Sequence, residues 1–199
     1  MNQKKLILGI IGIIVVIALA LVAFTFIFPD EETVYNEKMA QVSIDMETIE
    51  NQSKVLNFND TAEPTVEQCD QVISLSNNMS EMINNDTEIL LDLNQSVENQ
   101  TRKEYIGAIL EYFNQTQSSV DDVKKIATTF KDYKAGTIGQ SEAMNTMGQV
   151  LPKLDKKDAD MNQTLAKITK MENDYPFLLS YTNNGTSLGE RYTNNTTAV

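Results

Sequence analysis

The residues of this chain whose type and spacing could do chemistry are asparagines placed two positions before a serine or threonine. The 199 residues include 19 Asn and 30 Ser or Thr. Random placement would therefore give only about 3 Asn-x-Ser/Thr motifs, or sequons. The chain has eleven, none with proline at the middle position, and the chemistry they offer is attachment of an N-linked glycan. The candidate glycosylation sites are Asn51, Asn59, Asn78, Asn85, Asn94, Asn99, Asn114, Asn162, Asn184, Asn194 and Asn195.

Residues for other chemistries are missing. The chain has no histidine, which excludes Ser-His-Asp and Cys-His nucleophile systems, His-ligated zinc and an imidazole base. Asp158-Ala159-Asp160-Met161-Asn162 matches the first three ligand positions of a calcium loop. Gln163 and Thr169 stand where such a loop needs glycine and glutamate. The sequence therefore predicts no catalytic residue, no metal site and no cofactor, and we expect the protein not to be an enzyme.

One long apolar segment precedes all of the sequons. Leu6–Phe28 contains no charged residue, and a helix of that length, roughly 34 Å, would span a bilayer. Cleavage as a signal peptide is the alternative, but bulky side chains occupy the end of the segment, where a peptidase needs small ones. Lys4 and Lys5 precede the segment and acidic residues follow it. The sequence therefore predicts a single-pass anchor in membrane lipid, with the N-terminus cytoplasmic and the C-terminal domain outside the cell.

The charge of the chain limits its partners. The formal net charge is −12, with 28 acidic and 16 basic residues. Such a surface repels the phosphates of nucleic acid, so we expect no nucleic-acid partner. A protein partner or a homo-oligomer remains compatible with this composition.

Beyond the anchor, apolar residues recur in alternating steps of three and four, as in the a and d positions of coiled coils. Four such seams predict four long helices, with polar interruptions at Ser76, Asp86 and Asp158. The seams run through Tyr35, Met39, Val42, Met46, Ile49, Ser53 and Leu56; Cys69, Val72, Ser76, Met79, Ile83, Asp86, Leu90, Leu93 and Val97; Ile106, Ile109, Phe113, Thr116, Val120, Val123, Ala127 and Phe130; and Met144, Met147, Leu151, Leu154, Asp158, Met161, Leu165 and Ile168.

The ends of these helices are also marked. Thr65 and Gln68 could form a capping box, and Gly136 ends a helix. The second and third seams are out of register, which predicts a break near 99–103; a continuous helix with rotated faces is the alternative. Pro152 lies inside the fourth seam and should kink or restart that helix.

The predicted fold class is all-α: a single N-terminal transmembrane helix followed by an extracytoplasmic antiparallel bundle of four helices, or of three long ones, with coiled-coil-like seams. Residues 1–5 form a cytoplasmic stub and 6–28 the transmembrane anchor. Residues 30–174 form the helical bundle and 175–199 a polar C-terminal tail.

Two functions are compatible with this pattern. The first is a membrane-anchored, N-glycosylated envelope protein whose non-catalytic helical ectodomain serves a structural or interaction role. The alternative is an extracytoplasmic sensory or accessory subunit that binds a small ligand or regulates a neighbouring membrane complex. A cavity lined by Ser76, Asp86 and Asp158 would favour the alternative. Glycans would leave the sequon-free stretch between Gln115 and Asp160, or the span itself, for partner contact.

Overall fold

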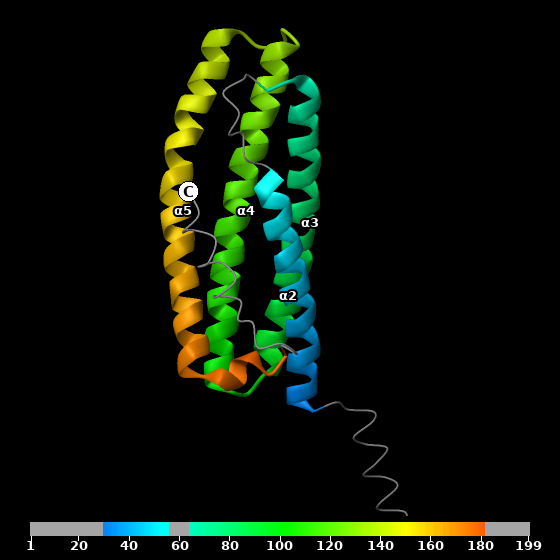
Figure 1. Ribbon diagram of the computed structural model, residues 1–199, viewed down its shortest axis with the longest axis vertical. Helices are drawn as coiled ribbons and strands as arrows, with labels where there is room; N and C mark the ends of the chain where they lie inside the picture. The colour runs from blue at the N-terminus through cyan, green and yellow to red at the C-terminus, as the bar shows by residue number, and fades with distance from the viewer. Residues whose placement is uncertain (1–29, 56–63, 182–199) are drawn as a thin grey trace, which may run out of the picture.

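The computed structural model describes residues 30–55 and 64–181, and every regular element in these ranges is helical. Consecutive α-helices run in opposite directions along one long axis (Figure 1). The elements are α2 (Glu31–Val55), α3 (Val66–Ser96), α4 (Gln100–Lys134), α5 (Gln140–Asp174) and the short 3-10 helix η1 (Pro176–Leu179). For the part of the chain that the structure describes, the prediction of an all-helical fold with four long helices is confirmed.

Local signals set the helix ends. Thr65 Oγ1 accepts from the Gln68 backbone N–H, and Gln68 Oε1 accepts from the Thr65 N–H, so the predicted capping box is present. Asn99 caps α4 by accepting from the Arg102 backbone N–H at 3.1 Å. Gly136 follows α4 with φ of 72°, a conformation that costs other residues more than glycine. The expected break between the second and third seams is present, but it lies at residues 97–99, slightly earlier than the predicted 99–103.

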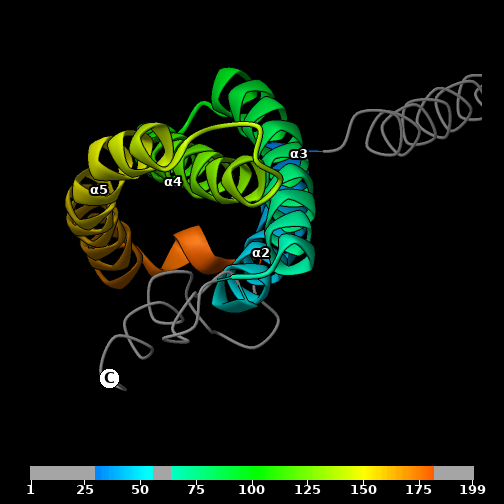
Figure 2. The ribbon, with the colours of Figure 1, turned by 90° about the horizontal axis from the view of Figure 1, so that it is seen from above.

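The core lies where the first three seams meet. The helices form an arc in the order α2, α3, α4, α5 when viewed along the bundle axis, and η1 lies between the two ends of the arc (Figure 2). All nine residues of the α3 seam are buried, including Ser76 and Asp86. The largest fully buried side chains come mostly from α2, α3 and α4: Tyr35, Tyr105, Phe113, Met39, Met46, Met79, Ile83, Leu90, Leu93, Ile106, Ile109 and Ile168.

The fourth seam is only half right. Leu165 and Ile168 are buried as expected, but Met144 and Leu151 are 62% and 51% exposed. Ala143 and Val150 are buried instead. In its first half α5 therefore turns a face one residue earlier toward α4. The main partners of α5 are α4 and η1, so only one long helix constrains this half. Asp158, predicted on the seam, is exposed as well.

Of the kink or restart expected at Pro152, the restart does not occur. The helix α5 continues through it from Gln140 to Asp174. Proline cannot donate its backbone nitrogen to the carbonyl four residues earlier, so α5 tolerates one missing bond at an exposed position.

None of the helices within 30–55 and 64–181 is long and apolar enough to cross a membrane. The anchor predicted at Leu6–Phe28 lies outside the described residues, as do the cytoplasmic stub and most of the C-terminal tail.

Candidate functional site

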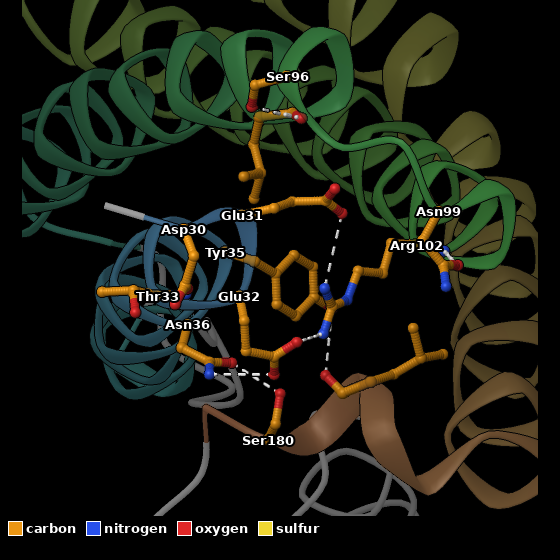
Figure 3. A network of polar contacts seen from close by, with 12 residues as sticks. Asp30, Glu31, Glu32, Thr33, Tyr35, Asn36, Ser96, Asn99, Arg102 and Ser180 are labelled. Carbon is orange, nitrogen blue, oxygen red and sulfur yellow. Dashed lines mark hydrogen bonds and ion pairs between the residues drawn. The ribbon is translucent and has the colours of Figure 1, made fainter. Parts of the chain in front are cut away.

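The base of the bundle carries a polar cluster around Arg102, on the first turn of α4. Its guanidinium is buried and forms ion pairs with Glu31, at 3.6 Å, and with Glu32, both on the first turn of α2 (Figure 3). It also lies 4.2 Å above the centre of the Tyr35 ring. Tyr35 Oη donates to the carbonyl of Leu178 in η1 at 3.1 Å. We call Glu31, Glu32, Tyr35, Arg102 and Leu178 the basal clasp.

The contacts of the basal clasp keep Glu32 ionised and Tyr35 neutral. Hydrogen bonding to Arg102 lowers the pKa of the Glu32 carboxyl, so this side chain stays ionised well into acid. Burial raises the pKa of the Tyr35 phenol, which therefore remains a neutral donor to η1. Because it joins three elements far apart in sequence, the clasp holds the start of α2 against α4 and η1.

A second network lies beside the clasp. Tyr105 Oη donates to Glu172 Oε1 at 2.7 Å and lies 3.2 Å from Tyr181 Oη. The Tyr181 ring packs edge-on against Tyr35, with ring centres 6.4 Å apart. Glu172, on the last turn of α5, is buried. Burial also raises the pKa of the Tyr105 phenol. These contacts connect α5 and the residues after η1 to the clasp.

Asp86 is the most unusual charge-bearing residue of the core. It is fully buried on α3, and neither carboxylate oxygen has a donor within the described residues. Its near neighbour is Asp45 on α2, which accepts from Gln41 Nε2 at 2.8 Å. Two ionised carboxylates have no proton to share, so a hydrogen bond between them requires a proton on one. Burial first, and then the charge and hydrogen bonding of Asp45, raise the pKa of Asp86 to about 8.

The sequon asparagines lie mainly on the surface of the helices. Asn94 is half-buried, and Asn59, Asn184, Asn194 and Asn195 lie outside the described residues. The Asn99 cap uses its Oδ1 atom, which leaves Nδ2, the atom that carries a glycan, for modification. The exposed asparagines are Asn51, Asn78, Asn85, Asn99, Asn114 and Asn162.

A groove lies between α4 and α5. It consists of a cavity of about 530 Å³ and a neighbouring one of about 440 Å³, which share Glu111, Gln115 and Asp160. Asn114, a sequon asparagine, lines the larger cavity. We call this the α4–α5 groove. Its other lining residues are Gly107, Leu110, Ser118, Lys157, Gln163, Thr164 and Lys167.

Of the three polar residues on the predicted seams, Ser76 and Asp86 are buried on α3 and Asp158 is exposed on α5. Neither cavity of the α4–α5 groove is lined by Ser76, Asp86 or Asp158. The calcium-loop resemblance at Asp158–Asn162 falls within a continuous helix, as the seam favoured. Within the described ranges, no group of three or more Cys, Asp or Glu side chains could hold a metal ion.

Sequence reasoning missed both the basal clasp and the groove. A signal for the clasp was present: Arg102 is one of only two arginines in the chain, and it lies within the break predicted near 99–103. A planar cation suits a buried pair with two carboxylates better than lysine does. The groove had no comparable signal, because its residues come from two helices and their spacing is that of ordinary solvated faces.

Comparisons with protein-family models, with curated proteins and with solved structures find no match to this chain.

Proposed function

We propose that this protein is a membrane-anchored envelope protein whose glycosylated helical ectodomain serves a non-catalytic structural or interaction role outside the cell. The observation that carries the proposal is the position of the sequons. Among the described asparagines of this kind, six are exposed and one is half-buried. Glycans on those six would lie outside the buried core, so the bundle could carry a sugar coat without disturbing its packing.

The basal clasp supports a rigid connection between such an ectodomain and its anchor. Glu31 and Glu32 begin α2 just after the apolar segment that ends at Phe28. Their ion pairs with Arg102 fix this first turn to α4. A force or rotation applied through the anchor would therefore reach the whole bundle and not α2 alone.

Partner contact is proposed on the sequon-free stretch between Gln115 and Asp160, or at the span. This stretch includes the connection between α4 and α5, at the end of the bundle opposite the clasp (Figure 1). It also carries the exposed side chains of Met144 and Leu151. Exposed apolar side chains of this kind are typical of contact surfaces.

Glycopeptide mapping of the protein purified from its own membranes tests the sugar coat. We expect glycans on several of the six exposed asparagines. Chains recovered without any glycan would contradict that part of the proposal.

Site-specific photo-crosslinking in intact cells tests the contact surface. A crosslinking residue at Met144 should capture a protein neighbour, and one at Asn85, which replaces a sequon asparagine on α3, should not. Capture only from Asn85 would place the contact elsewhere.

A further inference from the structure

We propose that the α4–α5 groove is the seat of the glycan carried by Asn114, so that the first sugar lies against α5 instead of projecting freely. This inference rests on the proposed glycosylation and goes beyond it, because it assigns one glycan a packed position and a structural role. None of the other sequon asparagines in the described ranges lines either cavity.

The groove offers the chemistry that sugar hydroxyl and amide groups recognise. Asp160 is half-buried and lines both cavities. Among the described residues, its hydrogen bond from Thr164 goes to the backbone carbonyl, and its carboxylate has no hydrogen bond or ion pair. Gln115 Oε1 is buried and has no donor within those residues. The Asp160 carboxylate and Gln115 Oε1 both accept hydrogen bonds, and a pyranose ring supplies several O–H donors. A buried acceptor without a hydrogen-bond donor costs free energy. A sugar O–H group that donates to Gln115 Oε1 would remove that cost.

The size and floor of the groove fit the same ligand. Volumes of about 530 and 440 Å³ lie in the range of small-molecule sites. Gly107 and Leu110 give the larger cavity an apolar portion suited to the C–H face of a sugar ring. Lys157 is already held by Asp122 and by the carbonyl of Ser118, at 2.7 Å from the latter. It therefore forms a fixed edge of the groove and does not compete for the acceptors.

The burial of the Thr116 hydroxyl requires that Asn114 is glycosylated before α4 packs. Thr116, which completes the Asn114 sequon, is buried, and its hydroxyl donates to the Tyr112 carbonyl at 2.9 Å. An enzyme that reads this hydroxyl could reach it only before α4 packs. Transfer forms a bond from Asn114 Nδ2 to the anomeric carbon, breaks that carbon's bond to the phosphate of a lipid-linked donor, and releases one amide proton. The helices then assemble beside a sugar that is already attached.

The test uses the full-length chain made in a eukaryotic secretory host and purified in detergent. A peptide N-glycosidase is applied to the folded protein, and mass spectrometry follows release at each sequon. Protection by local structure should slow release of the Asn114 glycan at least about tenfold relative to the glycan on exposed Asn78. Denaturation should abolish the difference. Asp160→Ala should speed release at Asn114 only, and Asp155→Ala, at an exposed position on the same helix, should leave it slow.

The outcomes separate the inference from the proposal on which it rests. Equal release at Asn114 and Asn78 in the folded protein would overturn the seating and leave the glycoprotein proposal standing. An unoccupied Asn114 with glycans at other sequons would likewise overturn the seating and leave the glycoprotein proposal standing. No glycan at any sequon would overturn both. Slow release at Asn114 that Asp160→Ala does not alter would contradict the assigned groove.

Discussion

At the scale of single residues, Asp86 decides how the stability of the bundle varies with pH. Its pKa is raised to about 8 in the folded protein, against about 3.9 in an unfolded chain. At a pH between these two pKa values, Asp86 is protonated in the folded state and ionised in the unfolded state. Stability from this site is complete below about pH 4 and is lost as the pH rises through 8. At about 1.4 kcal/mol per pH unit, the loss is at most about 6 kcal/mol.

Replacing Asp86 by Asn should remove this dependence, because the amide donates to Asp45 without titrating. We expect denaturant unfolding of Asp86→Asn to give a free energy nearly constant from pH 5 to 8, where the parent chain weakens. Asp92→Asn, at an exposed position on the same helix, serves as the control and should follow the parent. A parent chain as stable at pH 8 as at pH 5 would contradict the assignment.

The contribution of Glu32 to stability has the opposite pH dependence to that of Asp86, because it is lost as the pH falls. Arg102 lowers its pKa, so its contribution to stability is present above the unfolded pKa and disappears as the pH falls through the folded one. The clasp therefore weakens in strong acid, where the Asp86 site is at its most favourable. Comparing Glu32→Gln with the parent should show a stability difference at neutral pH that shrinks below about pH 4.

Arg102 itself should be the most sensitive position of the basal clasp. Arg102→Ala removes a buried cation that two carboxylates and the Tyr35 ring contact, and we expect a loss of about 2 kcal/mol in the free energy of unfolding. Lys170→Ala, which breaks an exposed pair with Asp174, should produce no measurable change. Urea unfolding monitored by circular dichroism compares the two. Equal effects would show that the clasp is no tighter than a surface ion pair.

At the scale of the helices, Pro152 makes α5 weaker than its length suggests. Proline within a helix costs about 3 kcal/mol relative to alanine. Because Pro152 is exposed and α5 continues through it, Pro152→Ala should stabilise the protein by about 1–3 kcal/mol. Thermal unfolding would show a higher midpoint, with Lys153→Ala as the exposed control. A lower midpoint would mean that α5 is stabilised by the proline ring or by the local backbone geometry that it imposes.

The helices could be predicted from sequence because their apolar periodicity and end signals agree. The α3 seam, its capping box and the glycine after α4 all reappear in the structure. The first half of α5 could not be placed in this way. Its apolar residues fit a heptad pattern, but periodicity does not say which neighbour a face meets. With α4 as the main long partner, Val150 is buried and Leu151 is left in solvent.

Contacts between segments far apart in the chain could not be predicted from the sequence either. The partners of Arg102 in α2 are about 70 residues away, and those of Tyr35 in η1 are 143 residues away. Only the folded arrangement brings such pairs together. The same is true of the α4–α5 groove, in which Gln115 and Asp160 meet across two helices.

At the scale of the whole molecule, the two ends of the bundle have different roles in this account. The end that carries the clasp continues toward the proposed anchor. The opposite end carries the sequon-free connection between α4 and α5 and is proposed for partner contact. Glycans on the helix surfaces between them would keep the sides of the bundle apart from other proteins. This division of roles depends on one claim, that residues after Phe28 lie outside the cell.

Labelling intact cells with a membrane-impermeant, amine-reactive reagent tests that claim most directly, with peptide mapping before and after lysis. We expect Lys153 and Lys156, exposed on α5, to be labelled in intact cells. Lys4 and Lys5 should react only after lysis. Labelling of Lys153 and Lys156 that appears only on lysis would contradict that claim.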